Sequence, residues 1–278
     1  MMEKKEKRRE AVKVENLKKS YGDRQVLKGV SFQVGRGEIF GVLGVNGAGK
    51  TTLLECLEGF RRYEEGTVWI GGTCGVQLQN AALPAYIRPE EAMKLFSGWK
   101  GTKRDRQSRP ALELEDIRGK RYGQLSTGQK RRLQLALALI GSPEILFLDE
   151  PAAGLDVEAR QKLHRAILEL KKEGTAIILT SHDMGEVEQL CDRIAILREG
   201  SLIFQGTAKE LAARTDGRCR VKIVTKEGEE VRFMREIGEE LLAALEEYKR
   251  KGIRIQDIQV DRGTLEEHFL SLAGEVRP

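Results

Sequence analysis

A glycine-rich loop near the N-terminus carries residue types that could hold a phosphate group. It lies between a short apolar run and a helical pattern. Glycines let successive backbone N–H groups turn inward, and the N-terminus of the following helix adds positive potential. Lys50 is expected to reach the outer phosphates, and the Thr51 hydroxyl suits Mg²⁺, which prefers oxygen ligands. The predicted nucleotide-binding residues of this loop are Gly44, Val45, Asn46, Gly47, Ala48, Gly49, Lys50, Thr51 and Thr52.

Two adjacent acids, Asp149 and Glu150, end the apolar run 145–148. A run of this kind is typical of a strand buried on both faces. The first carboxylate could hold Mg²⁺ through water, and the second could orient and polarise an attacking water. Taken alone, the pair could be two surface acids at a strand end. Behind a complete phosphate loop, it predicts nucleotide hydrolysis.

The pentapeptide Leu125-Ser126-Thr127-Gly128-Gln129 narrows the kind of phosphate chemistry. A phosphate loop and an acidic strand would also fit kinases and GTPases. The pentapeptide stands just before a helical pattern, so Ser126 and Gly128 could present a hydroxyl and an N–H group to a phosphate. An ordinary serine N-cap is the alternative interpretation. The pentapeptide together with the acidic strand about twenty residues later is far more specific than a cap.

From about residue 12 to residue 206, these motifs and their order resemble the ABC ATPase family. The resemblance implies an α/β fold of the P-loop NTPase class, an ABC-type core with a helical subdomain, and ATP and Mg²⁺ as ligands. The family usually has Leu-Ser-Gly-Gly-Gln where this chain has Thr127 in third place. Ser126, Gly128 and Gln129 are expected to bind nucleotide as in the family. Ala153, in Ala153-Gly154-Leu155-Asp156, lacks a hydroxyl that the family often has, so a dimer contact there is expected to differ in detail.

The resemblance also assigns residues outside these motifs. Tyr21 matches an aromatic residue that stacks on adenine. Gln79 matches a glutamine that contacts Mg²⁺ and the attacking water, with Gln77 as the rival if the register differs by two. His182, in Thr180-Ser181-His182-Asp183, matches a histidine that contacts the γ-phosphate. The implied catalytic residues are Lys50, Gln79, Glu150 and His182, and the implied Mg²⁺ residues are Thr51, Gln79 and Asp149.

The elements that must position these residues alternate between strand and helix. Short apolar runs at 39–43, 145–148 and 175–180 predict buried strands, and residues 51–57 and 157–172 have helical periodicity. This alternation predicts a mostly parallel sheet with crossover helices.

Three regions follow from the patterns. We expect a charged tail at residues 1–11 and the nucleotide-binding domain at residues 12–217, with a helical subdomain at about 80–141. We expect a small α+β module at residues 218–278. Within the subdomain, helices are predicted at 90–99 and 130–140. In the module, strands are predicted at 220–224, 230–234 and 254–260, with a helix at 239–250.

Composition limits the partners and the location. The chain has 278 residues and a net charge of +5, with four cysteines outside any Cys-x-x-Cys pair. It contains no apolar stretch of membrane-spanning length and no signal-peptide pattern at the N-terminus. No nucleic-acid partner is expected, because basic residues are mixed with acids. The resemblance implies a separate multispanning permease, which would hold the chain at the cytoplasmic face of the membrane. It also implies a second nucleotide-binding subunit, either another copy or a paralogue.

The direction of transport depends on analogy. The end of the chain, from Gly263 to Gly274, resembles subunits of the drug, antibiotic and polysaccharide efflux branch, although an amphipathic helix would explain the same pattern. An importer ATPase, a soluble ABC ATPase acting on ribosomes or DNA, and an iron–sulfur-assembly ATPase remain as alternatives. The apolar residues Leu83, Pro84, Tyr86 and Ile87 are predicted to form a docking groove for a partner helix, with packing inside the helical subdomain as the alternative.

Overall fold

The computed structural model describes the chain as two compact units, residues 1–205 and 206–278. The described residues are 10–77, 83–101, 112–214, 219–226, 228–234, 236–261, 265–267 and 269. Across these ranges, no helix is both long enough and apolar enough to cross a membrane.

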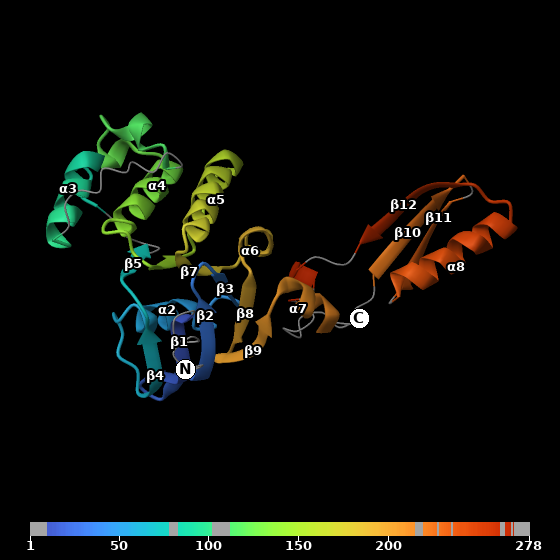
Figure 1. Ribbon diagram of the computed structural model, residues 1–278, viewed down its shortest axis with the longest axis horizontal. Helices are drawn as coiled ribbons and strands as arrows, with labels where there is room; N and C mark the ends of the chain where they lie inside the picture. Colours follow the sequence, from blue (N-terminus) through green and yellow to red (C-terminus); the bar gives the residue numbers. More distant parts are fainter. Residues whose placement is uncertain are drawn as a thin grey trace. The chain divides into compact units, whose positions relative to one another are not determined.

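Six strands form the main sheet of the first unit, in the order β5-β6-β7-β3-β8-β9 (Figure 1). The neighbouring strands β5, β6, β7, β3 and β8 are all paired in parallel, which confirms the predicted mostly parallel sheet. Every residue of β3, β6 and β7 is buried, which explains their continuous apolar sequence. The bounds are β3 Ile39–Leu43, β5 Cys74–Gln77, β6 Ile145–Asp149, β7 Ala176–Ser181, β8 Arg193–Arg198 and β9 Ser201–Gly206.

Three helices of the first unit pack around this sheet. They are α2 Lys50–Leu57, α5 Val157–Lys172 and α6 Met184–Leu190. The Asp156 side chain caps α5 by accepting a hydrogen bond of 2.8 Å from the Ala159 N–H, and Gly174 follows the helix with a φ of 93°. Figure 1 shows α2 and α5 on opposite sides of the strands.

A second, antiparallel sheet completes the core on the α2 side. Its order is β2-β1-β4, with bounds β1 Glu10–Tyr21, β2 Arg24–Gly35 and β4 Glu65–Ile70. Apolar residues of β1, β2, β3, β6, β7 and α2 form one buried cluster. β4 was not predicted, because most of its residues are exposed and it lacks an apolar pattern.

The helical subdomain has its own small core. Its described elements are α3 Pro89–Trp99, the 3₁₀ turns η2 Leu114–Ile117 and η3 Tyr122–Gln124, and α4 Thr127–Ala138. Ile117, Leu133 and Leu137 are among the residues of the shared apolar cluster. The helix predicted at 130–140 begins three residues earlier, because Ser126 caps it. The helix ends at Ala138, two residues earlier than predicted, and Gly141, with a φ of 84°, follows three residues later.

The second unit is an α+β module. Its sheet has the order β11-β10-β12 and is antiparallel, and α8 supplies Ala244 and Tyr248 to the core against Val221 and Ile223. The bounds are α7 Ala208–Arg214, β10 Cys219–Thr225, β11 Glu229–Met234, α8 Ile237–Arg250 and β12 Ile255–Asp261. The two compact units divide after residue 205, so α7 belongs to the second unit. The predicted domain boundary after residue 217 stays a prediction.

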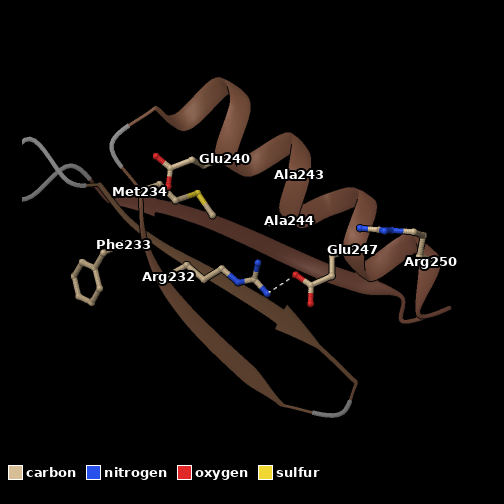
Figure 2. A pocket seen from close by; sticks show the side chains of 8 residues that line it. All are labelled: Arg232, Phe233, Met234, Glu240, Ala243, Ala244, Glu247 and Arg250. Carbon is tan, nitrogen blue, oxygen red and sulfur yellow. Dashed lines mark hydrogen bonds and ion pairs between the residues drawn. The ribbon is translucent and has the colours of Figure 1, made fainter.

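An open groove of about 650 Å³ runs between β11 and α8. Figure 2 shows Arg232 of β11 reaching Glu247 of α8, a contact of 3.0 Å. Met234 and Ala244 are buried at its base, and Phe233 points away from α8. The ion pair therefore ties the edge strand to the helix that covers the sheet.

Glu58, which follows α2, has a buried carboxyl oxygen. Within the described part of the chain, its Oε1 has no hydrogen-bond partner. Burial raises the pKa of Glu58 to about 7, and the nearby charges of Asp149 and Glu55 add to the increase. Because the pKa is higher in the folded state, this group's contribution to stability is complete below about pH 4.5. It is lost as the pH rises through about 7.

We predict that Glu58→Gln removes this loss. The free energy of unfolding of the wild type should fall by about 1–2 kcal/mol more than that of Glu58→Gln between pH 5 and pH 8, a value reduced for partial exposure. Urea unfolding at several pH values measures it, with the exposed Glu188→Gln as control. Parallel pH profiles for wild type and Glu58→Gln would contradict the assignment.

Candidate nucleotide-binding and hydrolysis site

The phosphate loop connects β3 to α2, as the sequence predicts. Gly47 and Gly49 have φ values of 82° and 109°, which non-glycine residues rarely adopt. A Cβ atom on Gly44 would lie 2.5 Å from the carbonyl oxygen of Leu197. Gly47 and Gly49 are therefore required by the backbone path of the loop, and Gly44 by its close packing against β8.

Lys50 is buried at the start of α2. Its Nζ donates to the carbonyl oxygens of Gly44 at 2.7 Å and Val45 at 3.3 Å. Burial lowers the pKa of Lys50, while the charges of Glu150 and Asp149 oppose this shift. The ammonium group is thus placed inside its own loop, where a phosphate oxygen can take the place of a carbonyl.

Asp149 and Thr51 bring two oxygens together from different elements. The Thr51 hydroxyl donates to Asp149 Oδ2 at 3.3 Å, and Asp149 is 6% exposed. Mg²⁺ takes oxygen ligands at about 2.0–2.1 Å and commonly uses one or two carboxylates besides phosphate oxygens. The donor set therefore fits the metal that the sequence predicts, and the assignment of Thr51 and Asp149 as its ligands stays a prediction.

Glu150 and His182 are brought into contact by the sheet. Glu150 has a φ of 46°, a left-handed backbone that is uncommon for a non-glycine residue and is often found at functional sites. Its Oε1 lies 3.2 Å from Nδ1 of His182. The Glu150 side chain is largely buried, whereas that of His182 is 61% exposed. The predicted base and the predicted phosphate-contacting histidine thus face one space.

Hydrogen bonds fix the loop that carries His182. The Ser181 hydroxyl donates to Glu186 Oε2 at 2.6 Å and accepts from the Asp183 N–H at 3.0 Å. Asp183 accepts at Oδ1 from the Glu186 N–H and at Oδ2 from Arg160 Nη1, both at 3.0 Å. The residues on both sides of His182 are therefore anchored.

Ser126 is the N-cap of α4, as the alternative interpretation expected. Its Oγ accepts from the Gln129 N–H at 3.2 Å, and the Gln129 side chain accepts from the Ser126 N–H at 3.1 Å. The cap uses the hydroxyl as an acceptor, so its proton remains to be donated. Capping and phosphate binding are therefore compatible in one residue.

Packing and one carboxylate hold the pentapeptide in place. Asp116 accepts from Gln129 Nε2 at 3.4 Å and from Arg132 Nη2 at 2.9 Å. A Cβ atom on Gly128 would lie 2.7 Å from Cβ of Ala159 on α5. Gly128 is therefore required for close packing on α5, a reason that the sequence did not show.

Tyr21 ends β1 with an accessible ring. It is 41% exposed, and Lys19 Nζ and the Arg61 guanidinium lie 5.3 and 5.4 Å from the ring centroid. Such cation–π contacts hold the ring in one orientation. The position is compatible with stacking on a base, which stays a prediction.

Of the two candidate glutamines, the structure describes only Gln77, the rival. Gln79 lies outside the described residues. Gln77 ends β5 and is 1% exposed, and neither amide atom has a hydrogen-bond partner within the described part of the chain. A side chain buried in this way is not presented to a solvent-accessible metal, so the geometry does not favour Gln77.

Sequence reasoning missed Thr180 and Asp116 as parts of this site. Thr180 contacts the backbone of Glu150 and the Asp149 carboxylate, and Asp116 contacts the pentapeptide. A threonine in an otherwise apolar strand was the available signal for Thr180. Asp116 lies in a charged segment that gave no signal.

Comparisons with known proteins show which family the chain resembles. The family described as ABC transporter matches residues 27–153. The daunorubicin resistance ATP-binding protein DrrA3 of Streptomyces coeruleorubidus is 34% identical in an alignment that covers 96% of this chain and 97% of that protein. Nod factor export ATP-binding protein I of Paraburkholderia xenovorans (strain LB400) is 37% identical over 226 residues, 74% of each chain. A solved structure of the ATP binding subunit of an ABC transporter has a TM-score of 0.68 and 27% identity, covering 74% of this chain and 93% of that one.

We predict that Tyr21→Ala weakens ATP binding by about ten-fold, because it removes roughly 1–1.5 kcal/mol of aromatic contact. Tyr21→Trp should retain the affinity, since a ring remains. Tyr86→Ala, at an exposed tyrosine of the helical subdomain, is the matched control. Calorimetric titration with ATP and Mg²⁺ gives the dissociation constants, and an unchanged value for Tyr21→Ala would remove the stacking role.

Proposed function

The chain belongs to the ABC transporter family and is an ATP-binding, ATP-hydrolysing subunit, and from this premise we propose that it powers export through a separate membrane permease. The relative matched over nearly the whole chain is named for daunorubicin resistance, and another is named for Nod factor export. The likeness to a solved ABC cassette confirms the predicted fold class. A drug-like or other hydrophobic or amphipathic molecule is the substrate class that these names support.

In the proposed reaction, Glu150 accepts a proton from the water that attacks the γ-phosphate. His182, 3.2 Å from its Oε1, orients that carboxylate and contacts the γ-phosphate. Lys50 neutralises phosphate charge, and Gln79 helps to place the water. Mg²⁺, held by Thr51 and Asp149, would neutralise charge on the phosphate oxygens when bound.

A second nucleotide-binding subunit completes each site in this proposal. The Ser126 hydroxyl has a proton that its cap does not use. A phosphate on Lys50 of one chain can therefore be met by Ser126 and Gly128 of the other, with the helix N-terminus of α4 adding positive potential. The second chain is another copy or a paralogue.

Permease docking is supported by the surface of α3. Leu95 and Trp99 are 61% and 81% exposed and line an open groove of about 880 Å³. Exposed apolar side chains gathered in this way are typical of interaction sites. Of the residues predicted to form the docking groove, Leu83 and Ile87 instead pack against the helical core, while Tyr86 is 74% exposed. A permease bound here would hold the chain at the cytoplasmic face of the membrane.

Inside-out membrane vesicles that contain the chain and its permease separate the alternatives. An exporter accumulates the transported compound in these vesicles when ATP is added. An importer ATPase would instead empty preloaded vesicles. A soluble ATPase unconnected with transport would leave vesicle contents unchanged in both assays, and either of these results would overturn the proposal.

We predict that Glu150→Gln lowers ATP turnover by about a hundred-fold or more and leaves ATP affinity intact, because it keeps the size of the side chain but removes the general base. Two unhydrolysed nucleotides should then hold the chains together as a stable ATP-dependent dimer. Size-exclusion chromatography with ATP and Mg²⁺ measures the dimer.

Ser126→Arg in the Glu150→Gln background is the control for this dimer. It places a bulky cation at the partner's phosphates and should abolish dimerisation without unfolding the monomer. An ATP-bound Glu150→Gln protein that stays monomeric would count against the sandwich. Normal turnover would remove Glu150 from the catalytic role.

We also predict that Leu95→Glu with Trp99→Glu reduces recovery of the chain with its permease by at least about ten-fold, since charges replace apolar contact area. The ATPase activity of the isolated subunit should stay within about two-fold of wild type. Leu242→Glu changes a similarly exposed leucine of the second unit and is the control. Unaltered binding of the double variant would place the docking surface elsewhere.

A further inference from the structure

Thr180 lies one residue before the end of β7 and has no exposed surface. Its register partners are Asp149 of β6 on one side and Val42 of β3 on the other. The sheet thus places Thr180 between the strand that carries the two acids and the strand that leads into the phosphate loop. Thr180 begins the segment Thr180-Ser181-His182-Asp183, in which only His182 has been given a role toward the nucleotide.

The Thr180 hydroxyl makes one hydrogen bond in each direction. It donates to Asp149 Oδ1 at 2.5 Å and accepts from the Glu150 N–H at 3.1 Å. The hydroxyl proton is therefore donated to Asp149, and a lone pair of the same oxygen accepts from the backbone of the next residue, Glu150. Few side chains could do both, because the donor and the acceptor must be the same buried atom.

The first bond fixes the direction of the Asp149 carboxylate. Oδ1 is bound by Thr180, and Oδ2 accepts from Thr51 at 3.3 Å. A carboxylate held at both oxygens cannot rotate freely. Oδ2 is therefore kept toward Thr51, which is the other residue that fits Mg²⁺.

The second bond supports the strained backbone of Glu150. A φ of 46° at this residue costs energy, on the order of 1–3 kcal/mol, so the surrounding structure must select it. The Glu150 N–H is directed at Thr180, whose carbonyl oxygen lies 3.2 Å away in addition to the hydroxyl. Relaxation of this φ would turn the Glu150 side chain away from His182.

We propose that Thr180 is a positioning residue for ATP hydrolysis, through which one buried hydroxyl sets both the Asp149 carboxylate and the Glu150 backbone. The inference rests on the roles proposed above for these two acids. Thr180 does not touch the nucleotide in this scheme, so its removal affects turnover and the Mg²⁺ requirement more than nucleotide affinity.

Thr180→Val, which keeps the shape and removes the hydroxyl, tests the inference. The kcat for ATP should fall by about ten- to hundred-fold, the scale of one hydrogen bond to a charged group. The half-saturating Mg²⁺ concentration should rise several-fold, and ATP affinity measured without Mg²⁺ should stay within about two-fold. Thr180→Ser, which restores the hydroxyl, should recover kcat to within about three-fold of wild type.

Thr175→Val is the matched control, because Thr175 is also buried and immediately precedes β7. It should leave kcat and the Mg²⁺ requirement unchanged. Wild-type kcat for Thr180→Val would overturn the inference, and so would equal losses in Thr180→Val and Thr180→Ser. If Thr180→Val is not recovered as a folded protein, Thr180→Cys replaces it with the same expectations, since a thiol has a similar volume and is a weak donor.

Glu150→Gln measured in parallel separates this inference from the proposed function. At saturating Mg²⁺, which offsets the effect through Asp149, Thr180→Val in the Glu150→Gln background should add little further loss of turnover, because the remaining effect acts through Glu150. Additive losses would overturn the positioning role of Thr180. Normal turnover in Glu150→Gln itself would instead overturn the catalytic assignment of Glu150.

Discussion

The pairing of three buried parallel strands is the constraint on which the site depends. β3, β6 and β7 run in one direction, so their carboxyl ends meet at one edge of the sheet. The register places Asp149 beside Thr180 and Leu43 beside Ser181. The phosphate loop follows β3, the histidine follows β7, and the two acids stand at the end of β6. A slip of one residue in any pairing would turn the facing side chains to the opposite face of the sheet.

The charges at this edge combine one buried cation, Lys50, with the two acids Asp149 and Glu150. Lys50 is buried deeply enough for its pKa to be lowered, yet it lies close enough to Asp149 and Glu150 for their charges to oppose that change. Lys50 Nζ donates to carbonyl oxygens of its own loop. If a phosphate oxygen replaced one of these carbonyl oxygens, the Lys50 ammonium group would keep its number of hydrogen bonds.

The pentapeptide is built by different physics. Its position comes from a helix cap, from the close packing of Gly128 on α5 and from Asp116, which is shared between Gln129 and Arg132. The helical subdomain has a separate apolar core. The edge that carries the phosphate loop and the acids is therefore stabilised by sheet register, and the pentapeptide by helix packing.

The sequence by itself determined the buried strands β3, β6 and β7, the helices α2 and α5 and the fold class, because continuous apolar runs, glycines and helical periodicity are local signals, whereas the exposed β4 gave no such signal. Residue type and spacing also predicted roles for the phosphate loop, the acids and the pentapeptide, whereas the role of the histidine came only from the family resemblance. Only the tertiary structure decided that Gln77 is buried, that Leu83 and Ile87 pack inward, and that Thr180 and Asp116 contact site residues. These outcomes depend on which strands and helices meet and in what register. Long-range pairing sets that register, and no local pattern of residues encodes it.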